Sequence, residues 1–245
     1  MVGATRSEGI TVTHALVKRI SVLACAALLL GGCASSTRKD PIEGFNRAMF
    51  GLNEAIDKAA IKPLAKGYDF VLPSPVKKGV ANFFGNVDDV FIGVNNLLQG
   101  KGITGASDLG RFVINSTVGI FGLFDVASTI GMEKHDEDFG QTFGRWGIGP
   151  GAYVVVPFFG PRTARDTVGL VLDVKADPVA HIKKVRARNT LLVTRVISDR
   201  SQLLPADKVI EEAALDKYTY IRDGYLQRRR NLIYDGDPPR EKEDF

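Results

Sequence analysis

The sequence contains few of the residues from which metal centres and disulfide frameworks are built. Its 245 residues include two cysteines, three histidines and one tryptophan. Cys25 and Cys33 lie in one short apolar segment, which argues against a disulfide framework. His14, His135 and His181 are scattered along the chain, without the Cys/His spacing of a metal site. We therefore expect no bound metal and no disulfide-rich fold.

Motifs for nucleotide and ester chemistry are also missing. The sequence has no Gly-x-Ser-x-Gly motif, and it offers no evident partner for His135 or His181, so a phospholipase is the weaker hypothesis. The segment Gly147-Ile-Gly149-Pro-Gly151 contains the glycines of a phosphate-binding loop. However, no strand precedes it, no Lys-Ser/Thr pair follows it, and Pro150 removes a backbone donor. We expect a protein that is not an enzyme.

The charge balance gives no support to nucleic-acid binding. The full chain has 32 basic and 28 acidic residues and a net charge of +4. Residues 1–32 hold three of the basic residues and one of the acidic ones, so the remainder carries a net charge of +2. Part of the basicity therefore belongs to the N-terminal segment, and we expect no nucleic-acid partner.

The apolar run near the N-terminus is too short to cross a membrane. Ile20–Leu30 has eleven residues, whereas a membrane-spanning helix needs about 20. Lys18 and Arg19 precede the run, and Leu30-Gly31-Gly32-Cys33 closes it in a way that resembles the lipobox of bacterial lipoproteins. A buried N-terminal helix is the alternative, but the segment has no amphipathic stripe. We predict a lipoprotein signal peptide over residues 1–32.

Cys33 is the predicted site of lipid attachment. Cleavage would leave it as the first residue, acylated on its thiol and on its new amino group. More than one acyl chain is needed for stable anchoring, since each buried methylene contributes about 0.8 kcal/mol. Ala34 rather than Asp follows Cys33, which in many Gram-negative lipoproteins directs the protein to the outer membrane. The covalent lipid is the only cofactor expected, and residues 33–39 are predicted to form a lipidated tether.

Helical periodicity continues through most of the chain after residue 40. Asp40-Pro41-Ile42-Glu43 has the composition of a helix start with Asp40 at the N-cap, and Pro63 and Pro73 predict a turn-rich connection. Residues 75–98 carry apolar side chains three and four apart, and Gly100 follows where a C-cap belongs. Further helices are expected over residues 163–173, about 178–198 and 207–233, followed by a polar, disordered tail over 235–245.

Three segments leave alternatives open. The second half of residues 102–130 is apolar on nearly every side, which is typical of a helix that is buried in a core or in contact with lipid. The charged segment 133–138 suits a solvated loop better than a metal site, which needs converging oxygens. The basic helix over 178–198 is compatible with an anionic surface or with the exposed face of a packed helix.

Residues 139–161 are rich in glycine and aromatic residues. We predict a mobile, hairpin-like loop with an aromatic lining. Residues 152–159 are expected to supply a short strand, which Pro157 and Gly160 end.

Five separated motifs resemble the MlaA (VacJ) lipoproteins. The similarity runs from about Asp40 to Asp173 and is looser from Val174 onward. The motifs are Asp40-Pro-Ile-Glu-Gly-Phe-Asn46-Arg47, Asn95-Asn96-Leu-Leu98-Gln99-Gly100, Arg111-Phe-Val-Ile-Asn115-Ser-Thr-Val-Gly119, Asp138-Phe-Gly-Gln141-Thr142 and Trp146-Gly147-Ile-Gly149-Pro-Gly151-Ala-Tyr153.

The resemblance implies an all-α, ring-like body over residues 40–234 that lies in one leaflet of the outer membrane and has a central amphipathic channel. It implies removal of mislocalised phospholipid from the outer leaflet, with transfer to a periplasmic carrier of the MlaC type, and association with an outer-membrane porin trimer. A structural lipoprotein that scaffolds porins or the envelope is the alternative.

Six residues are candidates for the channel or its loop. In the family the glycine- and aromatic-rich loop borders the channel, so Gly147 and Gly149 either supply flexibility or simply form a tight turn. A lipid head group also needs polar partners along its path, which makes polar residues within apolar helices candidates. The candidates are Trp146, Gly147, Gly149, Tyr153, Asn115 and Asp125.

Overall fold

The computed structural model describes residues 40–240. The predicted signal peptide, Cys33, the tether and residues 241–245 lie outside the described residues. In chain order the elements are α2 (Glu43–Ile56), the π-helical η2 (Asp57–Ile61), α3 (Lys62–Val71), α4 (Ser74–Leu98), α5 (Gly102–Thr117), α6 (Val126–Thr129), α7 (Phe139–Arg145), β1 (Tyr153–Val156), β2 (Gly160–Thr163), α8 (Ala164–Ala176), the 3₁₀ helix η3 (Pro178–His181), α9 (Val185–Ala213) and α10 (Lys217–Ile233).

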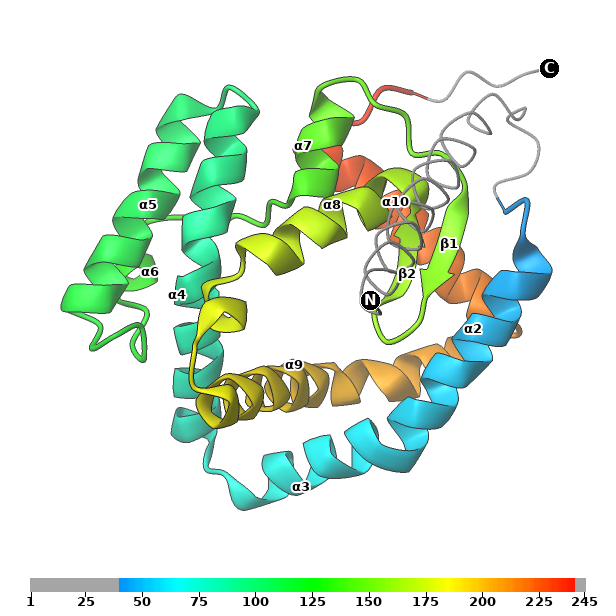
Figure 1. The fold of residues 1–245 in the computed structure, drawn as a ribbon, viewed down its shortest axis with the longest axis horizontal. Coiled ribbons are helices and arrows are strands. Elements are labelled where there is room, and N and C mark those ends of the chain that lie inside the picture. Colours follow the sequence, from blue (N-terminus) through cyan, green and yellow to red (C-terminus); the bar gives the residue numbers. More distant parts are fainter. Residues whose placement is uncertain (1–39, 241–245) are drawn as a thin grey trace, which may run out of the picture.

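The helices follow one another round the periphery of the body, as Figure 1 shows. One continuous arm consists of α2, η2 and α3, and α4 and α5 form an antiparallel pair on another side. The long helix α9 packs along α3 and also meets α4. The one sheet in the described residues is a two-stranded antiparallel hairpin of β1 and β2. All other elements there are helices, so the predicted all-α class is confirmed. Within residues 40–240 no helix combines the length and apolarity needed to cross a membrane.

The first helix begins two residues later than the sequence predicts. Asp40 is not its N-cap: α2 starts at Glu43 after Ile42, without a side-chain cap. The carboxylate of Asp40 instead accepts hydrogen bonds from Asn46 and from the hydroxyl of Tyr218 on α10. Asp40 therefore makes tertiary hydrogen bonds in place of the predicted N-cap interaction.

The turn-rich connection predicted at Pro63 is wrong. Helix α2 continues through η2 into α3, with Pro63 in the first turn of α3. A π-helical turn lets a helix absorb a residue that cannot donate its own backbone bond. Pro73 does end a helix, since Leu72 before it is extended. The prediction over residues 75–98 is confirmed by α4, as is the C-cap, because Gly100 has φ +81°.

The apolar segment after Thr117 does not continue as a helix to residue 130. The chain turns back so tightly at Gly119 that a Cβ there would lie 2.2 Å from the carbonyl oxygen of Phe124. Gly122 follows with φ +84°. A side chain fits at neither of these two glycines, and the turn leaves Phe121 76% exposed. The segment is thus an exposed apolar turn, not the centre of a core.

The C-terminal helices divide at a different point from the one predicted. Residues 207–213 belong to α9, which contains Pro205, and α10 begins only at Lys217 with Asp216 as its N-cap. The helix predicted over 163–173 is confirmed as α8, with Thr163 at its N-cap. The loop predicted over 139–161 contains a helix that the sequence did not reveal, α7, together with the expected strand β1.

The surface and interior have an unusual distribution of polarity. In residues 40–240, more polar than large apolar side chains are fully buried. A small aromatic core of Tyr153, Val155 and Tyr218 joins β1 to α10. At the same time many large apolar side chains are exposed, among them Phe70 at 92% and Ile103 at 91%. Apolar patches of this kind indicate contact with lipid or with a partner.

Candidate functional site

The glycine-rich loop between α7 and β1 brings three of the sequence candidates together. Trp146 follows α7, is 56% exposed, and donates a hydrogen bond from Nε1 to the carbonyl oxygen of Leu98, 3.0 Å away. Gly147 has φ +90°, a conformation in which side chains are strained. Gly149 lies in open space, where an added Cβ would meet no atom within 4 Å. The exposed loop is thus tied to the end of α4 through Trp146.

Tyr153 lies in the core rather than on the loop surface. Its side chain is 1% exposed, and its ring packs edge-on against Tyr218, with centroids 6.2 Å apart. Burial raises the pKa of Tyr153 to about 12. Tyr153 therefore fixes the start of β1 from the inside, while the loop that precedes it stays exposed.

Two asparagines of α2 hold the hairpin in register. Asn46 is fully buried; its Nδ2 donates to the Tyr153 carbonyl at 2.9 Å, and its Oδ1 accepts from the Val155 N–H at 2.8 Å. Asn53 repeats the pattern with the Val156 carbonyl at 3.0 Å and the Phe158 N–H at 2.8 Å. Each side-chain amide acts as a peptide group of a neighbouring strand. Because residues seven apart share one helix face, α2 covers the free edge of β1.

This pair of asparagines, here called the asparagine clip, positions the exposed aromatic tip of the hairpin. Phe158 and Phe159 at the turn are 76% and 51% exposed, and Phe158 has φ +67°. Neither asparagine was a candidate from the sequence, although Asn46 lies in the first family motif. Two asparagines seven apart on an amphipathic helix were the signal that could have revealed them.

A buried arginine joins the three helices behind the loop. Arg229 of α10 donates to both carboxylate oxygens of Asp138, at 2.6 and 2.9 Å, and to Asp166 at 3.0 Å. Asp138 caps α7, and Asp166 lies in the first turn of α8. A run of three arginines near the end of a helix suggests interaction with the helix dipole, but the fold uses Arg229 as a buried tertiary link.

Charge and close packing both hold this junction together. Burial would raise the pKa of Asp166, but the charges of Arg229 and Arg165 outweigh burial and lower it. Helices α7 and α8 cross at glycines: a Cβ on Gly169 would lie 2.4 Å from the backbone nitrogen of Gly140. The start of the loop is therefore fixed by an ion-pair network and by a backbone contact.

Asp173 at the same junction carries a half-buried charge at a cost. Its Oδ1 accepts the Phe139 N–H at 3.2 Å. Burial raises the pKa of Asp173 to about 6, although that hydrogen bond opposes the rise. A carboxyl group whose pKa is higher in the folded than in the unfolded state binds more protons when folded. Its contribution to stability is therefore lost as pH rises from about 4 through 6.

Replacement of Asp173 by asparagine is expected to stabilise the protein near neutral pH. The amide keeps the acceptor for Phe139 and removes the half-buried charge, so the gain is about 1–2 kcal/mol after allowance for partial solvent contact. Denaturant unfolding across pH 4–8 measures this. The gain in the free energy of unfolding should vanish at the acidic end of this pH range. Asp237→Asn, at an exposed position, should show no gain at any pH. A pH-independent gain would contradict the assignment.

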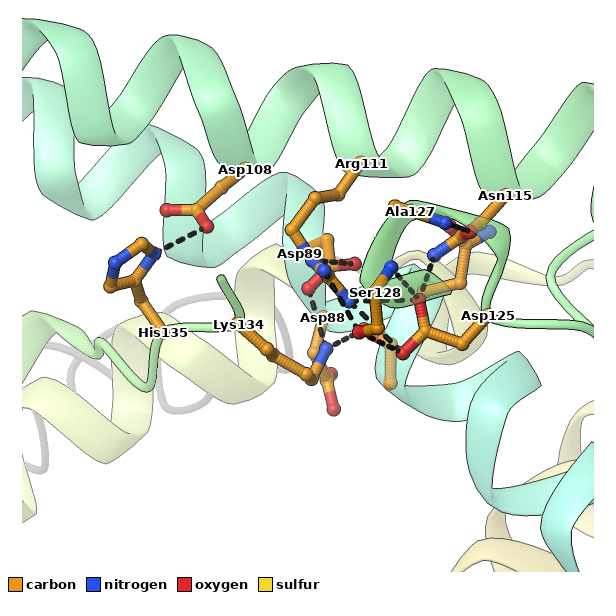
Figure 2. A network of polar contacts seen from close by, with 12 residues as sticks. Asp88, Asp89, Asp108, Arg111, Asn115, Asp125, Ala127, Ser128, Lys134 and His135 are labelled. Carbon is orange, nitrogen blue, oxygen red and sulfur yellow. Dashed lines mark hydrogen bonds and ion pairs between the residues drawn. The ribbon is translucent and has the colours of Figure 1, made fainter. Parts of the chain in front are cut away.

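Asn115 and Asp125 lie apart from the loop, in the network shown in Figure 2. Asn115 donates to Asp125 at 3.0 Å and accepts the Ala127 N–H at 2.9 Å, so both ends of its amide are used inside the protein. Burial opposes ionisation of Asp125, but hydrogen bonds from Ser128 and Asn115 and the charge of Arg111 lower its pKa to about 2. Their place on a lipid path stays a prediction.

The charged segment 133–138 is not a freely solvated loop. Lys134 contacts the buried Asp89 at 2.5 Å, and Glu137, 9% exposed, accepts from Lys101 at 2.8 Å. His135 Nδ1 lies 2.8 Å from Asp108, so the prediction that this histidine lacks a partner is wrong. His181 also has one, since its Nδ1 lies 2.9 Å from the Asp177 carbonyl oxygen. Residues 40–240 contain no group of three side chains suited to a metal ion.

An open pocket of about 490 Å³ lies between this segment and α10. Its lining includes His135, Gln227 and Asn231. None of the six sequence candidates lines it.

Comparisons with known proteins agree on one family. The model of the MlaA lipoprotein family matches residues 38–232. The intermembrane phospholipid transport system lipoprotein MlaA of Escherichia coli (strain K12) is 34% identical over 228 residues, which cover 89% of this chain and 90% of that protein. Its counterpart in Haemophilus influenzae is 29% identical over 245 residues, which cover 92% of this chain and 94% of that protein.

A solved structure extends the agreement to three dimensions. It was described under the heading "Structural basis for maintenance of bacterial outer membrane lipid asymmetry". It is 32% identical to this chain and has a TM-score of 0.69; the match covers 80% of this chain and 100% of the other. Since the family model spans most of the chain and relatives exceed 30% identity over most of their length, the protein belongs to the MlaA lipoprotein family.

Proposed function

We propose that the protein is an outer-membrane lipoprotein that removes mislocalised phospholipid from the outer leaflet and thereby maintains lipid asymmetry. The match to a solved structure concerned with outer-membrane lipid asymmetry, which covers 80% of this chain and all of the other, carries this proposal. The names of the relatives, which refer to intermembrane phospholipid transport, agree with it. In the proposal, acyl chains on Cys33 hold the body in the periplasmic leaflet.

The distribution of polarity supports immersion of the body in a leaflet. Exposed apolar side chains, such as Phe70 and Phe121, gain little from water but pack well against acyl chains. Helices satisfy their backbone groups internally, which hydrocarbon demands. A lipid head group on its way between leaflets needs polar partners, because an unsolvated charge in hydrocarbon is costly.

The proposed step moves a lipid without breaking a bond. The sequence has no nucleotide-binding motif, so we assign the direction of transport to downstream partners, first a periplasmic carrier of the MlaC type. An outer-membrane porin trimer is the proposed neighbour in the membrane. Selection would follow from geometry: a lipid with two acyl chains enters an amphipathic path that excludes bulky lipopolysaccharide.

Substitution at Gly149 separates lipid movement from folding. A Cβ added at this position meets no atom within 4 Å, and the position lies in open space, so Gly149→Leu should fold and reach the outer membrane normally. In a strain lacking the native gene, wild type should restore low surface phospholipid and detergent resistance, and Gly149→Leu should not, because a bulky side chain restricts the loop. Labelling of outer-leaflet phospholipid measures the difference.

The matched control is Gly149→Ala, which should transport nearly as well as wild type. Membrane fractions should contain equal amounts of all three proteins. If Gly149→Leu transports normally, the loop has no gating role. If the deletion strain shows an unchanged outer leaflet, the lipid-transport proposal fails and a scaffolding lipoprotein becomes the better explanation.

A further inference from the structure

Four basic residues at the start of α9 form an exposed cluster. Lys183, Lys184, Arg186 and Arg188 are here called the basic patch. Three of them are exposed and Arg188 is half-buried. The patch has a neutral side-chain contact, in which Arg188 Nε lies 3.4 Å from Asn189 Oδ1. Within residues 40–240 none of the four forms an ion pair, so their charges are not neutralised by the described part of the protein.

Farther along the same helix the arginines are paired. Arg195 contacts Asp88 at 2.5 Å and Asp177 at 3.3 Å, and Arg200 contacts Asp57 at 2.8 Å. Asp177 also accepts the N–H of Val179, so this carboxylate beside the patch is already engaged. The two alternatives left open by the sequence therefore apply to different parts of α9. Its middle is a packed helix, and its beginning is a free basic surface.

The fold gains nothing from this concentration of charge. Like charges at neighbouring positions repel one another, and cations near the start of a helix are disfavoured by its dipole. A partner with negative charge removes both costs. The patch is consequently better explained by a ligand than by stability.

The surroundings of the patch favour a membrane surface as that ligand. Val185, which lies between Lys184 and Arg186 in the patch, is 57% exposed. Cationic side chains interleaved with exposed apolar ones are typical of segments that lie at the boundary between head groups and acyl chains. An acidic protein surface would match the charges but would offer no apolar contact to the exposed side chain of Val185.

We propose that the basic patch binds the phosphate head groups of anionic phospholipids, phosphatidylglycerol and cardiolipin, in the leaflet where the protein is anchored. The inference rests on the proposed function only for that anchoring. Zwitterionic phosphatidylethanolamine creates little surface potential, whereas anionic lipids attract each nearby Lys or Arg. The patch would orient the body in the leaflet and gather anionic lipid beside it.

Lipid counting in nanodiscs tests the proposal without any transport step. The lipidated full-length protein is reconstituted in phosphatidylethanolamine discs that contain a minor fraction of phosphatidylglycerol, and the lipids retained are compared with those of empty discs. Wild type should enrich phosphatidylglycerol at least about twofold, and high salt should reduce the enrichment. Neutralisation of the patch by Lys183→Gln, Lys184→Gln, Arg186→Gln and Arg188→Gln should abolish it.

A second quadruple variant controls for net charge. Lys66, Lys78, Lys208 and Arg240 are cations outside the patch, and their replacement by Gln should leave the enrichment unchanged. Equal enrichment in wild type and the patch variant would overturn the inference. So would unchanged lipid content combined with loss of a co-purifying acidic protein, which would assign the patch to a protein partner. Failed transport with intact enrichment would count only against the proposed function.

Discussion

Replacement of Asn46 by leucine is expected to destabilise the protein by roughly 3–5 kcal/mol and to abolish lipid transport. The change keeps the size of the side chain but removes its bonds to Tyr153, Val155 and Asp40. Each buried polar group left without a partner costs about 1–3 kcal/mol. Denaturant unfolding of the detergent-solubilised protein measures the loss of stability, and labelling of outer-leaflet phospholipid measures transport.

Two further variants separate hydrogen bonding from shape. Asn46→Asp keeps one acceptor but turns a second oxygen toward the Tyr153 carbonyl and the Asp40 carboxylate, so it should be at least as harmful at neutral pH. Asn231→Leu, at an exposed position of α10, should cost well under about 1 kcal/mol. If Asn46→Leu unfolds with wild-type stability, the amide is not what holds the edge of β1.

Substitution of Asn53 should separate loss of lipid transport from loss of stability more cleanly than substitution of Asn46. It is only half-buried and bonds the turn of the hairpin, where Phe158 is exposed. Its loss therefore affects the position of the aromatic tip more than the stability of the core. This contrast between two asparagines of one helix connects the asparagine clip to function rather than to folding alone.

Local sequence signals predicted the helices well and those ends that depend on one residue's own conformational preference. Apolar spacing predicted α4 nearly to the residue, and Thr163 and Gly100 mark boundaries through their own conformational preferences. Pro63 led to a wrong prediction because the π-helical turn that precedes it, Asp57–Ile61, lets the helix continue. The end of α5 depends on Gly119 meeting the backbone of Phe124, a contact that no residue pattern within a helix encodes.

Site residues that act through backbone conformation could be predicted from the sequence. Site residues that act through tertiary hydrogen bonds or ion pairs could not. Gly147 and Gly149 stood out in the sequence, and both lie on the exposed loop. Asn115 looked like a polar residue on an apolar helix, but its amide is occupied by Asp125 and Ala127. Arg229 was hidden in a basic run, because burial is decided by what packs around a residue.

Replacement of Arg229 by methionine is expected to cost about 3–5 kcal/mol, since it leaves the buried carboxylate of Asp166 and the cap Asp138 without their shared partner. The neighbouring Arg228→Met removes an exposed pair with Asp136 and should cost at most about 1 kcal/mol. Thermal unfolding of the solubilised proteins, followed by circular dichroism, compares the two.

The pH dependence of the Arg229→Met effect identifies its cause. In wild type the pKa of Asp166 is lowered by Arg229 and Arg165, so its stabilisation is present above about pH 4 and is lost as pH falls through the folded value. Without Arg229, only Arg165 and Tyr225 offset the burial of the Asp166 carboxylate, so its protonation relieves part of the cost. The difference in stability between wild type and variant should therefore narrow from pH 7 toward pH 4. A gap of constant size would mean that the arginine acts through packing alone. The stability of Arg229→Lys should lie between those of wild type and Arg229→Met, because an ammonium group keeps the charge but cannot span Asp138 and Asp166 with a planar fork. The junction of α7, α8 and α10 that carries the loop would then depend on the geometry of one guanidinium group as well as on its charge.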